Sequence, residues 1–271
     1  MKKILVLFFI LLEYPTIGLS QDIQHYRSIA DTTHNAQLKL VALDSVISKS
    51  RNIDNDSFIV FSIQYIKLAK EIDSIESAAK KAMNLQYILS VKKNDSRKAI
   101  TIIDEVLANK YKIKDSFLLG GLYLKRGGAN YRIDINESIK DYTKALNNFG
   151  QKDSIYKADT YLFRGQAYSN LGKFVPAGED YKKAYTLFEA LKDYQYMLFS
   201  QQGNITMYSI NGFYDKAKKE RTLLIDKLTE LKLDHLLVMP YYNQSLDYKK
   251  QGDKKLQKKY LLKADSSLTD D

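Results

Sequence analysis

Apolar residues recur at steps of three and four along most of the chain from about residue 36. The runs LKLVALDSVI (38–47), FIVFSIQYIKLAKEI (58–72) and KAITIIDEVL (98–107) all show this spacing. It is the spacing of an amphipathic helix, and no segment has the strict alternation of a strand with comparable quality. The pattern therefore predicts an all-α protein.

Four Asp–Ser pairs mark where several of these helices begin. They stand at 56–57, 95–96, 115–116 and 153–154, each ahead of an apolar run. Asp and Ser accept hydrogen bonds from the free N–H groups of a first helical turn, and such caps are worth about 1 kcal/mol. The two NDS triplets also fit a glycan acceptor pattern, but the cap interpretation needs no further assumption and we favour it.

The pattern predicts twelve helices joined by short loops. Residues 21–35 have little pattern and are expected to form a leader, while Gly127 and Gly128 are expected at a helix end and turn. The predicted helices span 36–50, 56–72, 74–92, 95–109, 115–127, 135–149, 154–171, 174–191, 195–211, 214–231, 236–251 and 254–267.

Part of the chain repeats with a period of about 40 residues. Tyr168, Gly172 and Ala177 return as Tyr208, Gly212 and Ala217, and Gly252 and Ala264 continue the series. A shift of about 45 in the other direction finds Gly120, Tyr123 and Gly127. A fixed period of this length is typical of a repeat protein.

At these positions the chain resembles the tetratricopeptide repeat family. The match is most specific at Tyr161, Gly165, Tyr168, Gly172, Phe174, Ala177, Tyr181 and Ala184. The resemblance implies a right-handed α-solenoid of about six antiparallel helix pairs over residues 36–271, with the strongest repeats in 114–271. The chain departs from the family in its period near 40 instead of 34 and in Arg221, Lys254 and Gln257.

The small residues have a physical reason in such an array. Two helices approach most closely where side chains are small. Ala177 is therefore expected to contact the first helix of its own pair, and Ala184 is expected to contact the next pair. Gly172 is expected to end a helix because glycine tolerates a positive φ.

The resemblance also implies where a partner binds. In the family, the first helix of each pair lines a groove. The positions carried over, mostly aromatic and amide with a basic end, are Phe117, Phe163, Gln166, Asn170, Gln202, Thr206, Tyr242, Asn243 and Lys249. Such a surface suits an extended or helical peptide.

The sequence offers no catalytic or metal-binding pattern. It has no Cys, and its three histidines, His25, His34 and His235, lack metal-ligand spacing. Phosphate-loop and nucleophile motifs are absent as well. We therefore expect a protein that is not an enzyme and has no cofactor.

The N-terminus has the layout of a secretory signal peptide. Lys2 and Lys3 precede nine apolar residues, Ile4 to Leu12, and small residues follow at Gly18 and Ser20. The apolar run is short for a membrane span, which needs about 20 residues. We expect residues 1–20 to be cleaved and the mature chain to be periplasmic or secreted, with a retained anchor as the alternative.

The net charge of +10 is concentrated in part near the C-terminus, where seven lysines stand between Lys249 and Lys263. They form either a solvated helix face or a weak contact with an anionic surface, and export argues against nucleic acid.

The sequence thus predicts an exported, non-catalytic scaffold that binds a protein or peptide. The alternative is the extracytoplasmic sensor domain of a membrane-spanning regulator without its output part. A third hypothesis is an enzyme or polysaccharide-binding protein on a helical scaffold.

Overall fold

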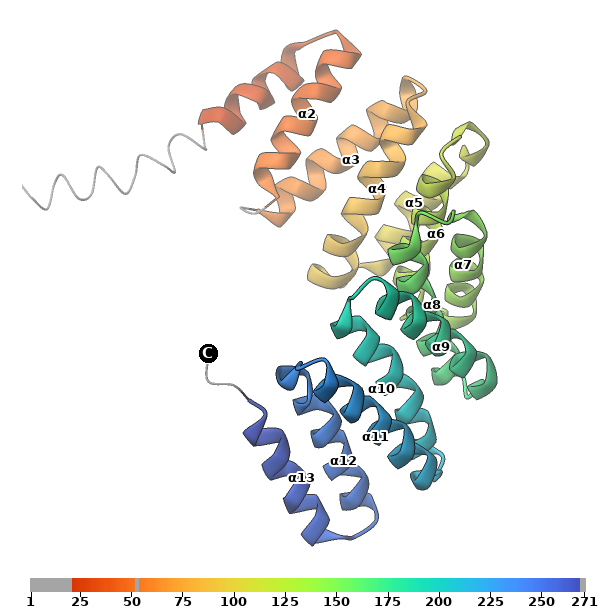
Figure 1. The fold of residues 1–271 in the computed structure, drawn as a ribbon. Coiled ribbons are helices and arrows are strands. Elements are labelled where there is room, and N and C mark those ends of the chain that lie inside the picture. The colour runs from red at the N-terminus through yellow and green to blue at the C-terminus, as the bar shows by residue number, and fades with distance from the viewer. Residues whose placement is uncertain (1–20, 52–53, 269–271) are drawn as a thin grey trace, which may run out of the picture. The chain divides into compact units, whose positions relative to one another are not determined.

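The computed structural model describes residues 21–51 and 54–268, and in them every regular element is a helix. The predicted signal peptide lies outside these residues. The α-helices are α2 (Ala36–Ser50), α3 (Asn55–Glu71), α4 (Ile75–Tyr87), α5 (Ser96–Leu107), α6 (Ser116–Asn130), α7 (Ile135–Asn148), α8 (Ser154–Asn170), α9 (Phe174–Ala190), α10 (Tyr194–Ile210), α11 (Tyr214–Glu230), α12 (Val238–Lys250) and α13 (Lys254–Ser266). Successive helices pack side by side as pairs, which confirms the all-α solenoid (Figure 1).

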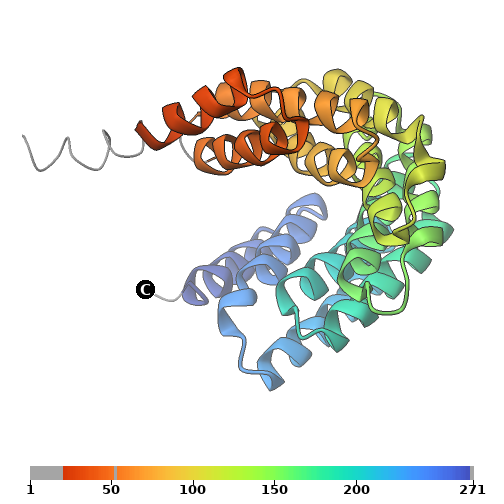
Figure 2. The same cartoon turned by 90° about the horizontal axis from the view of Figure 1, so that it is seen from above.

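The chain divides into two compact units, with the boundary between Glu137 and Ser138 in the first turn of α7. The division of the sequence into a leader and one repeat domain over 36–271 stays a prediction. The helices of both units are seen from a second direction in Figure 2.

The first unit contains one helix that the pattern did not predict. Residues 21–32 are helical, with Ala30 buried and Lys49 Nζ 2.8 Å from Asp22 Oδ2 on this segment. Arg27 also lies over the Phe61 ring, with its Cζ 5.7 Å from the centroid. These contacts, made to residues far along the chain, are invisible to a local pattern.

Helix α6 corrects a second expectation. Gly127 and Gly128 lie inside α6, which continues to Asn130, so they do not form a helix end. Gly127 is buried, and the turn to α7 begins at Tyr131. Tertiary packing overrides the weak helix propensity of glycine, which costs about 1 kcal/mol.

Capping agrees with the sequence at two of the four predicted starts. Asp95 accepts from Lys98 N, and Asp115 accepts from Phe117 N. At α3 the cap is Asp54, two residues before the predicted Asp56. Asp153 occupies the cap position of α8, but its Oδ2 accepts from Gly150 N at 2.8 Å in the preceding turn.

The second unit repeats itself closely. Helices α8 and α9 begin and end 40 residues before α10 and α11, because their bounds are 154–170 and 174–190 against 194–210 and 214–230. The turn within each pair has a glycine with positive φ, at Gly172 (71°), Gly212 (77°) and Gly252 (80°). The second unit therefore repeats its helix bounds and turn geometry as well as its residue types.

Small residues allow the close helix approaches of this unit. Ala177, Ala184 and Ala217 are fully buried and Ala264 nearly so. A Cβ on Gly165 would lie 3.2 Å from Tyr181 Cδ1, and one on Gly203 would lie 2.6 Å from Tyr181 Cε1. Tyr181 thus fills the space between α9 and its two neighbours only because both facing positions are glycine.

In the described residues, no helix is both long enough and apolar enough to cross a membrane. No group of three or more His, Cys, Asp or Glu side chains in that part of the chain is arranged to hold a metal ion.

Candidate functional site

The predicted groove residues on α8 share one exposed face. Phe163, Gln166 and Asn170 stand at steps of three and four, and all three are exposed, Phe163 to 37%. The Phe163 ring packs against the Tyr142 ring of α7, with the two ring centroids 6.3 Å apart. We call this face, together with Thr206 on α10 and Tyr242, Asn243 and Lys249 on α12, the first-helix surface.

The other predicted groove positions vary. Thr206, Tyr242 and Lys249 are exposed and Asn243 is half-buried. Gln202 differs from the expectation, because it is only 8% exposed and its Nε2 donates to Thr206 Oγ1 at 3.1 Å. It is the copy of Leu162, a position that packs inward in both repeats. Phe117 is half-buried in the first unit.

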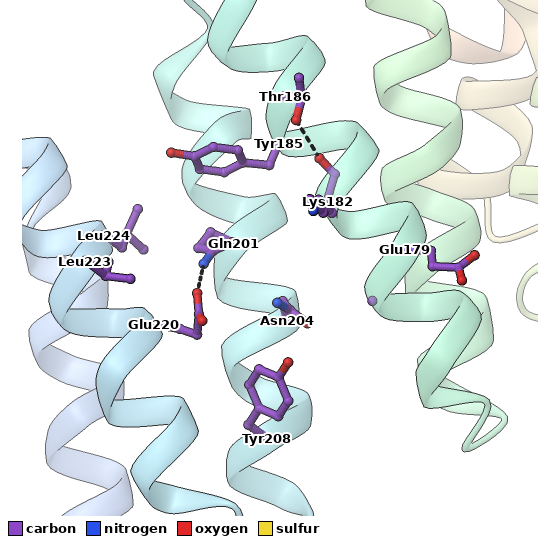
Figure 3. Close-up of a pocket in the computed structure, with 11 residues that line it drawn as sticks. Glu179, Lys182, Tyr185, Thr186, Gln201, Asn204, Tyr208, Glu220, Leu223 and Leu224 are labelled. Atoms are coloured by element: carbon purple, nitrogen blue, oxygen red, sulfur yellow. Dashed lines mark hydrogen bonds between the residues drawn. The ribbon is translucent and has the colours of Figure 1, made fainter.

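A hollow lies elsewhere, between the second helices of two successive pairs. A cavity of about 630 Å³ is lined by α9, α10 and α11, and a smaller one of about 260 Å³ adjoins it. The two share Gly178, Asn204 and Tyr208, so they form one furrow along α10. We call this the α9–α11 furrow; Figure 3 shows Gln201, Asn204 and Tyr208 along its floor, Glu220 and Leu223 on α11 and Lys182 on α9.

The floor and the first-helix surface lie on different sides of α10. Thr206 is two residues from both Asn204 and Tyr208, which places it about 160° round the helix from each. Gly178 on α9 has no side chain to fill the furrow. A Cβ added there would lie 3.5 Å from Asn204 Oδ1 and 3.7 Å from Met207 Cε, so a larger side chain at this position would enter the furrow.

Several polar groups line the middle of the furrow. Gln201 Nε2 donates to Glu220 Oε2 at 2.9 Å, which joins the floor to α11. Lys182 and Glu179, both exposed, line the α9 side. Burial, and secondarily the charge of Glu189, raise the pKa of the Tyr185 phenol. Tyr185 therefore stays a neutral hydrogen-bonding group.

The two ends of the furrow differ. Near the C-terminal ends of the wall helices, Lys227 Nζ lies 3.2 Å from Glu189 Oε1 and ties α11 to α9. The hydrogen bond to Glu189 raises the pKa of Lys227, so this cation persists. At the other end the lining is apolar and exposed, with Phe174, Val175 at 76% and Phe213 at 56%.

The C-terminal lysines lie on exposed positions of α12 and α13. No ion pair to a carboxylate occurs at Lys249, Lys250, Lys254, Lys255, Lys258, Lys259 or Lys263 among the described residues. Leu262 is exposed among them, and Lys263 Nζ lies 5.1 Å from the Tyr241 ring centroid. We call the exposed lysines of α13 together with Leu262 the α13 basic face.

Reasoning from the sequence missed the α9–α11 furrow, because it considered only the first helix of each pair. A signal was present in the repeat itself. Forty residues after Arg164 and Asp180, the chain has the shorter Asn204 and the longer Glu220. Where a long arginine in one repeat is replaced by a shorter asparagine in the next, an open space can be expected beside the asparagine.

Comparison with known proteins agrees with this architecture. Residues 158–190 match the tetratricopeptide repeat family model. No curated protein matches the chain. The fold is similar to that of a Signal Transduction ATPase with Numerous Domains protein with a tetratricopeptide repeat sensor from Pyrococcus horikoshii, with TM-score 0.70 and 16% identity over 94% of this chain and 40% of that one.

Two further solved structures are similar along most of their own length. BtubC from P. vanneervenii has TM-score 0.61 and 18% identity, over 79% of this chain and 91% of its own. The C-terminal part of a TPR repeat-containing protein from Cytophaga hutchinsonii has TM-score 0.56 and 16% identity, over 95% and 97%. Residues 158–190 are thus similar to a tetratricopeptide repeat, and the solved structures share the helical fold of the chain.

Proposed function

We propose that this chain is a non-catalytic, exported scaffold that binds an extended peptide segment of another protein in the α9–α11 furrow. The observation that carries the proposal is the open furrow itself, whose two adjoining cavities of about 630 and 260 Å³ share Gly178, Asn204 and Tyr208. Ligand sites are typically concave, with a few polar groups that fix orientation.

The floor suits a peptide main chain. Gln201, Asn204 and Tyr208 on α10 and Asn211 just after it follow one another at steps of three and four, so their amide and phenol groups form a row along one side of the helix. Asn211 Nδ2 also donates to Met207 O at 2.7 Å. A side-chain amide can donate to a carbonyl and accept from an N–H. A row of them can therefore bind successive peptide groups of an extended segment, while Phe174 and Phe213 offer an apolar end.

A displayed library of short peptides, selected on the full mature chain, tests this proposal. Gly178→Leu places a side chain into the furrow where a Cβ has ordinary contacts, so we expect it to abolish binding of the selected peptides. Phe163→Ala and Tyr242→Ala alter the first-helix surface and should leave that binding unchanged. A selected peptide that ignores Gly178→Leu and is lost in Phe163→Ala would refute the furrow.

The first-helix surface is the second candidate site. Phe163 and Tyr242 are exposed aromatic side chains, at 37% and 48%, and aromatic residues are enriched where proteins bind proteins. The two surfaces lie on different sides of α10, so the variants named above separate them.

Export remains part of the proposal and has its own test. Intact mass measurement of the protein recovered from its native host should give a chain that begins near Gln21. A chain that retains Lys2 and Lys3 would count against cleavage. The sensor-domain alternative keeps the same peptide furrow and adds transmission of the binding signal to an output part of the regulator.

A further inference from the structure

The pair α8–α9 has a half-buried arginine, Arg164, at the place where the next pair has its furrow. Arg164 Nε and Nη2 donate to Asp180 Oδ2 and Oδ1 at 2.7 and 2.9 Å, and Nη1 donates to Thr143 Oγ1 at 2.9 Å. The guanidinium therefore bridges α7 and α9 across α8. Burial alone would lower the pKa of Arg164, but the hydrogen bond to Asp180 and its charge raise it on balance.

Two aromatic rings complete this arginine site. Arg164 Cζ lies 5.7 Å from the Tyr161 ring centroid and 5.8 Å from that of Tyr168. A guanidinium within about 6 Å of a ring is attracted by its π electrons. A carboxylate, a hydroxyl and two aromatic rings thus contact the Arg164 head group.

The next pair, α10–α11, has most of the residues of this site at equivalent positions, but it lacks the arginine. The helix bounds shift by 40, so Arg164 becomes Asn204, Asp180 becomes Glu220 and Tyr168 becomes Tyr208. Tyr161 becomes Gln201, whose Nε2 donates a hydrogen bond to Glu220 Oε2 at 2.9 Å. The carboxylate and one ring remain, and the cation between them is missing.

We infer that the furrow binds the guanidinium of an arginine side chain of the partner peptide, in the place that Arg164 fills in the preceding pair. The inference rests on the proposed function and names the chemistry of its ligand. Glu220 would accept the charged donors, Tyr208 would face the guanidinium plane, and Asn204 leaves the room that an arginine stem requires. Arginine fits better than lysine because its planar fork bonds a carboxylate through two donors.

Two lysines near the furrow, Lys182 and Lys216, oppose a cationic ligand. Glu179 and Glu220 are favourable. Lys182 corresponds to Thr143 of the Arg164 site, because α9 begins 39 residues after α7. Lys182 is exposed, so its flexible stem can carry the ammonium away into solvent. Lys216 Nζ lies 5.8 Å from the Tyr208 ring centroid, so this ring can attract a cation, and the exposed Lys216 side chain would have to move aside for the arginine.

The test compares blocked peptides that differ in one residue. One carries a single arginine after a phenylalanine, and its partner carries citrulline, which has the same shape without the charge. Isothermal titration with the full mature chain should show binding of the arginine peptide roughly tenfold tighter, the size expected for a charged hydrogen bond. Glu220→Gln should remove that difference, while Glu230→Gln, a carboxylate at the end of the same helix, should keep it.

Two variants work in opposite directions. Asn204→Arg supplies the missing guanidinium from the chain itself, so it should raise the melting temperature and abolish binding of the arginine peptide. Lys182→Thr completes the copy of the Arg164 site and should tighten binding, whereas Lys258→Thr removes the same charge on α13 and should not.

Equal affinity for the arginine and citrulline peptides, or no binding of either, would overturn the inference. Library peptides that depend on an open Gly178 position but lack arginine would overturn it too, while leaving the proposed function intact. Should no library peptide respond to Gly178→Leu, the proposed function fails first.

Discussion

Arg221 Nη2 lies 2.7 Å from Asp247 Oδ2, and this ion pair joins α11 to α12 inside the second unit. Arg221 is 2% exposed and stands at the position that holds Tyr181 in the preceding pair. Ser209 Oγ of α10 donates to the same Asp247 oxygen at 3.0 Å. An aromatic contact of one repeat is thus replaced by a buried charge pair in the next.

Asp247→Asn should strongly destabilise the protein. It leaves the Arg221 charge buried without its counter-ion, and breaking such a pair from one side costs roughly 3–5 kcal/mol. Urea unfolding followed by circular dichroism measures the change. The double variant Arg221→Met with Asp247→Leu, which removes both charges, should recover most of the loss; an equally unstable double variant would show that packing, not the unpaired charge, sets the cost.

Close packing around Tyr181 predicts a second set of losses. Gly203→Ala places a Cβ 2.6 Å from the Tyr181 ring, and Ala177→Leu adds bulk at a fully buried position between α8 and α9. Each should cost roughly 1–3 kcal/mol of unfolding free energy through overpacking. Exposed Ala190→Leu at the end of α9 is the matched control. Unchanged melting temperatures in both variants would contradict the assigned helix contacts.

Asp54 gives a pH prediction for α3. Hydrogen bonds from Ser57, followed by those from the backbone of Asp56 and Ser57, lower the pKa of Asp54. A lowered folded-state pKa means that the carboxylate contributes stability above its ordinary value of about 3.9, and loses it as the pH falls through the lowered value. The melting temperature of the natural chain should exceed that of Asp54→Asn at neutral pH, and the gap should close in acid. A gap that widens in acid would reverse the sign.

We propose that the α13 basic face makes a weak contact with anionic membranes. Vesicles containing phosphatidylglycerol should sediment the mature chain at low salt, and those of phosphatidylcholine alone should not, because each lysine near such a surface contributes about 1 kcal/mol. Replacing Lys254, Lys255, Lys258 and Lys259 with Gln should weaken binding more than roughly tenfold. Lys218 and Lys219 of α11, exchanged in the same way, provide the control. Equal retention of both variants would favour a solvated face.

The helices and their limits were largely decided by local sequence. Apolar spacing and turn glycines predicted α8 to α11 with ends within about one residue of those found, because amphipathic periodicity and positive φ are properties of short segments. The same logic failed at Gly127 and in residues 21–32, where contacts with other helices override a weak local preference.

The candidate site depended on tertiary structure. At the level of sequence, the family resemblance selected Phe163, Gln166 and Asn170 as groove residues, and their three- and four-residue steps agree with one helix face. It could not show that Gln202 turns inward, that Arg221 finds Asp247, or that a furrow opens between α9 and α11. Those facts depend on which side chains from different helices meet, and only the packed structure decides whether the space left by Asn204 is filled or open.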